Sequence, residues 1–246
     1  MFERDLAVGT MSAQLAKLIG LRIVAGDWSP GAALPIESEL CRIYGVSRST
    51  VREAMQKLSA KRLVEVAPKL GTRVLPFSDW NLLDPDVLSW RLGVQFDRRI
   101  VDDLYEVRNC FEPRACWLAA QGGTLEDHEL IARRFAALEA SFGTPELAAD
   151  ADVDFHLAII TATHNGLYVA IGMAVRTGLR ASFAVMQRRG LLPKHDVSLY
   201  RAVLDAIIAR DPGGAAMAMT TLLSMTRQRL VDALGQGEQS ARLPPE

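Results

Sequence analysis

Asp152 and His156 are spaced as two ligands of a metal site would be. They lie four residues apart in a segment with helical periodicity, so the carboxylate and the imidazole project from the same face of a helix. Such a pair is half of a site for a divalent ion such as zinc, nickel or manganese. Without a metal, the same groups are hydrogen-bonding residues of a pocket or a pair on the helix surface.

Three arginines in the same half of the chain are candidates for binding an acid. Arg108 lies beside the apolar stripe of a long predicted helix, and a buried arginine needs a carboxylate partner. That partner is Glu112, Asp152 or a bound acid, whose carboxylate would match the planar guanidinium fork. Arg176 and Arg180 are four residues apart on a mostly apolar helix, and we expect them to point into one cavity. The alternatives are an internal ion pair for Arg108 and a solvated helix edge for the other two.

The N-terminal part of the chain has basic and hydroxyl side chains at the start of a predicted helix. Ser47 suits the N-cap because its side chain accepts hydrogen bonds from N–H groups of the first turn. Val51, Met55 and Leu58 would form the buried stripe, which leaves the polar side chains outward. This arrangement is typical of a recognition helix in the major groove of DNA. The candidate contacts are Arg48 and Arg52 to guanine, and Ser49 and Thr50 to phosphate.

A short helix before the recognition helix and a hairpin after it complete the predicted unit. Ile36, Leu40 and Ile43 are spaced to face one side of the short helix, and Gly45 ends it because glycine takes positive φ readily. Residues 64–74 alternate as two strands around a turn. The hairpin adds three candidate contacts to the DNA backbone or minor groove, namely Lys69, Gly71 and Arg73.

Charge is divided unevenly along the chain. From Arg48 to Arg73 there are seven basic and two acidic residues, a net +5 that suits a surface facing phosphate. Lys61 and Arg62 in this stretch are expected at a solvated helix end. Residues 1–76 carry +4 and the remainder −5, although the whole chain carries only −1. We therefore expect only the N-terminal part to meet nucleic acid.

The 246 residues suffice for two modest domains. The three cysteines, Cys41, Cys110 and Cys116, have no paired or metal-ligand spacing, and we expect buried thiols in a reducing cytoplasm. No apolar run approaches the ~20 residues of a membrane span, and no secretory signal is present. The sequence therefore favours a cytoplasmic protein.

The periodicity predicts a mostly α protein with two domains. A winged helix-turn-helix is expected over residues 8–76, a packed connector over 77–94 and an all-α bundle over 95–235. The connector contains the chain-breaking Asp84-Pro85 pair but is too apolar for a free linker. No segment of the bundle alternates for long enough to be a strand. His128 is expected on the bundle surface and His164 at a helix end.

The segment from residue 34 to 74 resembles the winged helix-turn-helix of GntR-type bacterial transcription regulators. The matching residues are Leu34, Pro35, Glu37, Glu39, Leu40, Gly45, Val46, Ser47, Arg48, Thr50, Val51, Arg52, Glu53, Ala54, Leu63, Val64, Gly71, Thr72 and Val74. Two departures stand out. The family usually has a DNA-contacting arginine where this chain has Ser38, and a wing glycine where it has Lys69, so one contact is missing or made elsewhere and a different wing tip is expected.

The C-terminal half resembles the FCD ligand-binding domain that follows the winged helix in one large GntR branch. The matching residues are Glu106, Arg108, Glu112, Ala115, Asp152, Phe155, His156, Asn165, Ala202, Ala206 and Ile207. Many FCD domains complete a metal site at the aspartate and histidine with two later histidines. Those positions are Tyr200 and Leu222 here, so the ligand set is incomplete, and His195 could substitute only if its helix started differently.

The resemblance implies a ligand-responsive repressor that binds operator DNA as a homodimer and is not an enzyme. The connector resembles that of the sugar-acid branch, especially galactonate-responsive repressors, so the expected effector is a small acidic metabolite such as an aldonic acid. The expected effector-binding residues are Arg108, Asp152, His156, Arg176, Arg180 and Tyr200. The alternatives are a metal-dependent enzyme built on Asp152 and His156, and a metal-free regulator that senses an acyl-CoA.

Overall fold

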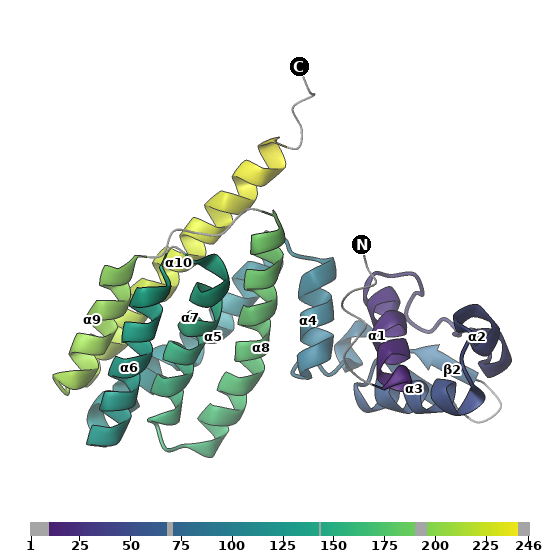
Figure 1. Ribbon diagram of the computed structural model, residues 1–246, viewed down its shortest axis with the longest axis horizontal. Coiled ribbons are helices and arrows are strands. Elements are labelled where there is room, and N and C mark those ends of the chain that lie inside the picture. Colours follow the sequence, from purple (N-terminus) through teal and green to yellow (C-terminus); the bar gives the residue numbers. More distant parts are fainter. Residues whose placement is uncertain (1–9, 68–70, 143, 190–195, 241–246) are drawn as a thin grey trace. The chain divides into compact units, whose positions relative to one another are not determined.

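The computed structural model describes residues 10–67, 71–142, 144–189 and 196–240, and it divides into two compact units (Figure 1). The first unit is Met1–Gln95 and the second is Phe96–Glu246. The predicted fold class is confirmed, because a winged helix-turn-helix precedes an all-helical unit. The connector predicted for residues 77–94 packs as part of the first unit.

The recognition helix α3 (Arg48–Ala60) is capped and buried as the sequence predicts. The Ser47 side chain accepts a hydrogen bond from the backbone N–H of Thr50 at 3.2 Å. Val51, Met55 and Leu58 all lie in the core of the first unit, where α1 (Met11–Val24) packs against α3. Their burial leaves the opposite face of α3 to solvent.

The helix before it, α2 (Glu37–Tyr44), buries one of the three apolar side chains that were predicted to share a face. Leu40 is in the core, whereas Ile36 is the N-cap and is 68% exposed, and Ile43 is 48% exposed. Gly45 ends α2 at φ 65°, the left-handed conformation expected there.

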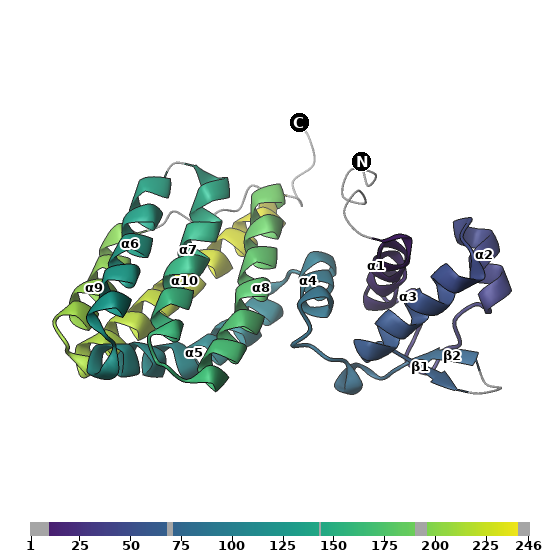
Figure 2. The ribbon, with the colours of Figure 1, turned by 60° about the horizontal axis from the view of Figure 1, so that its bottom comes forward.

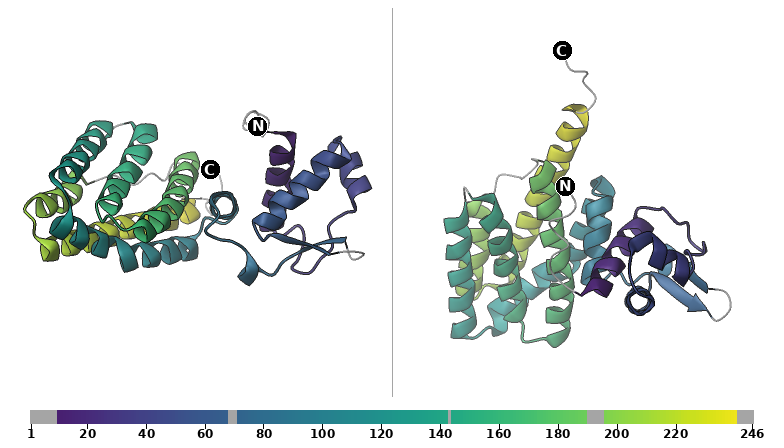
Figure 3. Two further views of the ribbon diagram at one scale, coloured as in Figure 1. Left: turned by 90° about the horizontal axis from the view of Figure 1, so that it is seen from below. Right: turned by 45° about the vertical axis from the view of Figure 1, so that its right-hand side comes forward.

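The wing is the antiparallel pair β1 (Val64–Ala67) and β2 (Gly71–Val74), seen beside α3 in Figure 3. The two predicted strands are confirmed, and Val64 pairs with Val74 with both side chains buried. The alternation does not set burial throughout, because Val66 is 55% exposed. The other edge of β2 is also paired. Leu34 donates its N–H to the carbonyl of Thr72 at 2.8 Å, which ties the chain before α2 to the wing.

The connector consists of the 3₁₀ turn η2 (Phe77–Asp79) and the helix α4 (Pro85–Val94). Trp90 of α4 is only 6% exposed and lies over Gly20 of α1, where a Cβ would collide with the indole ring. Val87 is fully buried in the same core. The helix therefore belongs to the first unit (the head) rather than forming a free linker.

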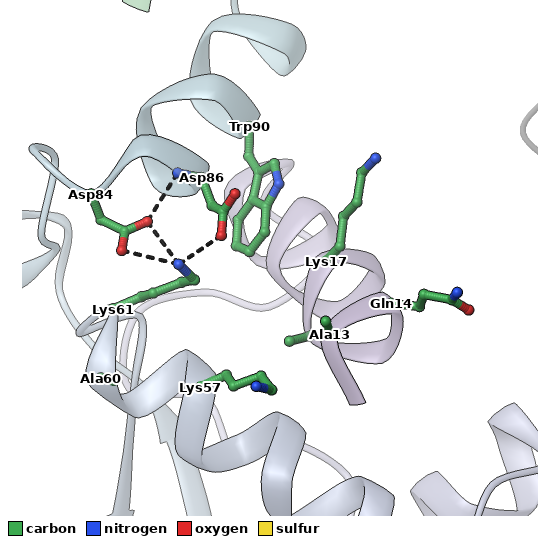
Figure 4. A pocket seen from close by; sticks show the side chains of 10 residues that line it. Ala13, Gln14, Lys17, Lys57, Ala60, Lys61, Asp84, Asp86 and Trp90 are labelled. Carbon is green, nitrogen blue, oxygen red and sulfur yellow. Dashed lines mark hydrogen bonds and ion pairs between the residues drawn. The ribbon is translucent and has the colours of Figure 1, made fainter. Parts of the chain in front are cut away.

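Lys61, at the C-cap of α3, ties that helix to the start of α4. Its Nζ lies 2.9 Å from Oδ1 of Asp84 and 2.7 Å from Oδ2 of Asp86 (Figure 4). A solvated helix end was predicted wrongly for Lys61, whose side chain is 17% exposed. Burial alone would lower the pKa of Lys61, but the hydrogen bonds that Lys61 donates to Asp86 and Asp84 outweigh it and raise the pKa. The residues border a cleft of about 420 Å³ whose lining includes Lys57 and Trp90.

The second unit is a bundle of helices around α5. The described helices are α5 (Arg98–Gly122), α6 (Leu125–Ser141), α7 (Pro145–Thr161), α8 (Gly166–Arg189), α9 (Val197–Ile208) and α10 (Pro212–Ser240). In Figure 2, α6, α7 and α8 form a row, and α5 lies along α10 across the base of that row. Contacts of α5 with α7, α8 and α9 place its side chains at the centre of the bundle.

Two side chains of the bundle differ from their predicted environments. His128 is 7% exposed rather than on the surface, because its Nε2 lies 3.1 Å from the carbonyl oxygen of Ala119, just before the turn between α5 and α6. Cys110 is exposed, whereas Cys116, two turns further along α5, is buried, and burial raises its pKa. His164 lies three residues after α7 ends at Thr161 and takes φ 52°, in agreement with its predicted place at a helix end.

By length and composition, Gly166–Gln187 of α8 could cross a membrane, with a mean hydropathy of 1.3. We expected no such run from the sequence. The indication is weak, because core helices of soluble bundles have the same character. Val175 and Leu179 of α8 pack with Phe111 of α5 in a buried cluster, which accounts for part of the apolar composition.

Candidate DNA-binding surface and effector site

The exposed face of α3 presents two arginines that share one carboxylate. Arg52 Nε lies 2.8 Å from Oε2 of Glu37, and Arg48 Nε lies 3.9 Å from Oε1 of the same side chain. The two arginine side chains are 68% and 73% exposed. Glu37 at the start of α2 therefore holds the Arg52 guanidinium by a hydrogen bond and lies near that of Arg48, and both side chains remain largely open to solvent.

The hydroxyl groups around the start of α3 form a compact set. Ser47 Oγ lies 2.8 Å from Ser49 Oγ and 2.9 Å from Thr50 Oγ1. Ser49 is exposed and Thr50 is half-buried, so both predicted hydroxyls lie at the N-terminus of the helix beside the arginines. A helix N-terminus also favours an anion such as phosphate through its unpaired N–H groups.

The wing is only partly described at its tip. Gly71 takes φ 79°, and Lys69 lies outside the described residues. Arg73 is exposed, but its Nη1 donates to the carbonyl of Gly31 at 2.8 Å, so part of its guanidinium is already used inside the head. Ser38, where the family pattern would have arginine, is exposed on α2.

A groove of about 420 Å³ separates α3 from the wing. Arg52, Val66 and Thr72 line it, and so does Gln56, one turn after Arg52. We did not select Gln56 from the sequence. Its spacing of four residues from Arg52 is the signal that would have found it, since residues four apart share a helix face.

The bundle contains a buried polar cluster that joins α5 to α7. Arg108 Nε donates to Oε1 of Glu112 at 2.6 Å, and Nη2 donates to Oε2 at 3.2 Å. His156 Nδ1 lies 2.8 Å from the same Oε2, and both ring nitrogens lie within 3.4 Å of Arg108 Nη2. Arg108, Glu112 and His156 are each at most 4% exposed.

The cluster continues to α9 through Asp152. His156 Nε2 lies 3.7 Å from Oδ1 of Asp152, and the Tyr200 hydroxyl donates to that oxygen at 2.6 Å. Asp152 and Tyr200 are 3% and 2% exposed. The structure thus brings together four predicted effector residues, with Glu112 as the partner of Arg108.

Electrostatics favour an ionised Arg108–Glu112 pair. Burial alone would raise the pKa of Glu112, but the charges of Arg108 and His156 outweigh it and lower the pKa to about 2. Burial likewise opposes ionisation of Arg108, and the charge on Glu112 overcomes it and raises the pKa of the guanidinium. Burial first, and then Asp152, raise the pKa of Tyr200 well above its usual range, so its hydroxyl stays protonated.

Arg176 and Arg180 do not share a cavity. Arg176 lines a small cavity of about 10 Å³ together with Glu112 and His156, which is room for about one water molecule. Its Nε is buried and has no hydrogen-bond partner among the described residues. Arg180 instead points to the surface, is 43% exposed and pairs with Asp150 at 2.8 Å. The prediction that both arginines point into one cavity is therefore wrong for Arg180. Arg176 faces Glu112 and His156 inside the bundle, whereas Arg180 faces Asp150 at the surface.

The described donor set does not fit a divalent metal. Both ring nitrogens of His156 already face Glu112, Asp152 or the Arg108 guanidinium, and Tyr200 donates a proton rather than a lone pair to Asp152. Leu222, at the other position expected for a histidine, is 1% exposed and has no ligating atom. Within the described ranges, no three His, Cys, Asp or Glu side chains are grouped to hold a metal ion. His195 lies outside these ranges.

A winged helix-turn-helix followed by a helical bundle with a buried polar cluster defines a two-domain transcription regulator. Residues 11–74 match the bacterial regulatory proteins of the gntR family, and residues 103–225 match the FCD domain. The chain therefore belongs to the GntR family and carries an FCD domain. The alternative of a metal-dependent enzyme is wrong, because the family and the named relatives are transcription regulators.

Similar proteins are known from Escherichia coli K12 and Listeria monocytogenes. The chain is 33% identical to the galactonate operon transcriptional repressor of E. coli over 214 residues, which cover 86% of this chain and 93% of the relative. It is 31% identical to the E. coli Uxu operon transcriptional regulator over 225 residues, covering 85% and 82%. The solved structure of Lar, which controls the L. monocytogenes agr system, has 19% identity and a TM-score of 0.62, covering 92% of this chain and 98% of that one, so it supports the fold alone.

Proposed function

We propose that this chain binds operator DNA by inserting α3 into the major groove. The observation that carries the proposal is the exposed pair Arg48 and Arg52 at the start of α3, with Arg52 held by a hydrogen bond to Glu37. An oriented guanidinium can donate two hydrogen bonds to guanine O6 and N7, whereas Ser49 and Thr50 suit phosphate. The wing residues proposed to contact the backbone or minor groove are Lys69, Gly71 and Arg73.

The proposed binding unit is a homodimer in the cytoplasm. Two copies of α3, one in each half-site, would read a near-palindromic operator, because a two-fold symmetric protein matches a two-fold symmetric site. The galactonate operon relative is named as a repressor, which supports repression as the sign of regulation here.

Replacing Arg52 tests the DNA-binding surface. Loss of a base contact costs about 1–3 kcal/mol, so Arg52→Ala should weaken operator binding by roughly 5- to 150-fold per subunit. Lys57→Ala is the matched control, because Lys57 is a cation on the same helix that lines the cleft with α1 rather than the wing groove. Fluorescence anisotropy at physiological salt measures both. Equal effects of the two changes would mean that net charge, not a specific contact, drives binding.

We propose further that the bundle binds a small acidic metabolite, an aldonic sugar acid being the first choice. Support comes from Arg176, whose buried Nε lacks a hydrogen-bond partner within the described part of the chain and lies beside Glu112 and His156. The present cavity holds about one water molecule, so an acid would have to move α8 away from α5 and α7. The relatives named for galactonate and uxu operons support a sugar acid. The acyl-CoA alternative calls for a large apolar channel, whereas this site is polar.

Two arginines on α8 make a matched test of the effector site. The probe is a panel of aldonic acids, scored by the rise in melting temperature of the full chain. Arg176→Ala should abolish the rise, whereas Arg180→Ala, one turn away and paired with exposed Asp150, should keep it. Retention of the rise in Arg176→Ala would move the site elsewhere. Because coupling is reciprocal, an acid that weakens operator binding must itself bind more weakly in the presence of the operator.

A further inference from the structure

Arg108 is a permanent cation at the centre of the buried cluster. It is 3% exposed and bonds to Glu112 through two nitrogens, while its Nη2 lies 3.3 and 3.4 Å from the two ring nitrogens of His156. The guanidinium thus lies against Glu112 and against His156, which is one of the two candidate metal ligands. The positive charge of Arg108 offsets the negative charge of Glu112. The contacts of Arg108 with His156 link α5 to α7.

A divalent ion in this cluster would compete with the guanidinium for the same donors. Zinc needs nitrogen and oxygen donors at about 2.0–2.2 Å with free lone pairs. Here Oε2 of Glu112 is already in contact with both Arg108 and His156, and Oδ1 of Asp152 already accepts a hydrogen bond from the Tyr200 hydroxyl. An ion held by His156 would also lie close to a buried positive charge, and like charges repel strongly where water is excluded.

We propose that the Arg108 guanidinium replaces a metal ion as the resident cation of this bundle. It holds Glu112 and His156 in place and makes the site independent of divalent metals. The role of Arg108 as resident cation follows from its contacts with Glu112 and His156 alone. Only its part in effector binding rests on the proposed effector site. In that use, Arg176 rather than a metal would meet the carboxylate of the acid.

Removing the guanidinium should therefore create a zinc site. In Arg108→Ala, the Glu112 carboxylate and the His156 imidazole would face the vacated space, and zinc accepts both kinds of donor, with water completing its coordination. We expect zinc chloride to raise the melting temperature of Arg108→Ala but not that of the native chain. The gain should disappear in Arg108→Ala/His156→Ala. Arg133→Ala, which removes an exposed arginine from α6, should show no zinc effect.

Elemental analysis of the native full chain, purified without chelator, is the second measurement and does not require a variant to fold. We expect far less than one equivalent of zinc, nickel or manganese per chain, and a melting temperature unchanged by chelator. One equivalent of metal in the native chain would overturn the proposal, as would a folded Arg108→Ala that gains no stability from zinc. Neither readout uses an acid or DNA, so failure of the effector or operator proposal remains separately detectable.

Discussion

Glu112→Gln should destabilise the bundle far more than the same change in an exposed ion pair. Glu112 is 2% exposed, and its oxygens accept hydrogen bonds from Arg108 Nε at 2.6 Å and Arg108 Nη2 at 3.2 Å. His156 Nδ1 lies 2.8 Å from one of the same oxygens. A neutral amide leaves the buried guanidinium without its countercharge. Breaking a buried pair in this way costs about 3–5 kcal/mol. For a unit of this size, each kcal/mol lowers the melting temperature by about 2–4 °C, so a loss of roughly 6–20 °C is expected.

The matched control is Glu129→Gln on α6. Glu129 pairs with Arg133 at the same spacing of four residues, but at 3.7 Å and with side chains 71% and 65% exposed, so at most about 1 kcal/mol is expected. Thermal and urea unfolding, followed by circular dichroism, measure both variants. The double variant Arg108→Met/Glu112→Leu removes both charges together and should recover much of the loss. Equal effects of Glu112→Gln and Glu129→Gln would show that the Arg108–Glu112 pair is not both buried and ionised.

Three further predictions concern pH and the DNA-binding head. The pKa of Glu112 falls from its ordinary ~4.3 to about 2 on folding, so its contribution is complete above the ordinary value and lost as pH falls toward 2. Unfolding at pH 7 and pH 3 should therefore show a smaller difference between Glu112→Gln and the native chain at pH 3, and a constant difference would contradict this. Lys61→Met should cost about 1–2 kcal/mol because two carboxylates lose their cation, whereas Lys57→Met, with no acidic partner in the described contacts, should be near neutral in urea unfolding. Gly20→Ala should cost about 1–3 kcal/mol because its Cβ meets an indole ring, whereas Gly93→Ala has open space; similar melting temperatures for these two would contradict the packing of α4 on α1.

Local signals in the sequence were sufficient for most of the DNA-binding head. The Ser47 cap, the Gly45 turn and the two wing strands depend on neighbours within a few residues, and all three are found. The exposure of Ile36 and Ile43 could not be predicted, because spacing cannot tell whether a second element covers that face of the helix. The bonds of Lys61 to Asp84 and Asp86 were missed for a related reason, since they depend on how α4 folds back on the head.

The buried cluster was predictable in membership but not in arrangement. The apolar stripe around Arg108 indicated that its side chain is buried, and Glu112 was one of its expected partners. The spacing of four residues placed Asp152 and His156 on the same helix face. The hydrogen bond from Tyr200 depends on contacts among α5, α7 and α9 that no local pattern contains. The different environments of Arg176 and Arg180 could not be predicted either, because spacing along α8 does not tell which side chain the rest of the bundle covers.

Selection of duplexes from a random DNA pool by the full-length protein is the decisive experiment for the proposed role of α3, since it works without a known operator sequence. We expect enrichment of a motif with two-fold symmetry that the native chain binds tightly at physiological salt. Arg52→Ala should lose that preference, and Lys57→Ala should retain it. A pool with no enriched motif, or one that Arg52→Ala binds as tightly as the native chain does, would contradict the assignment of α3 as the recognition helix.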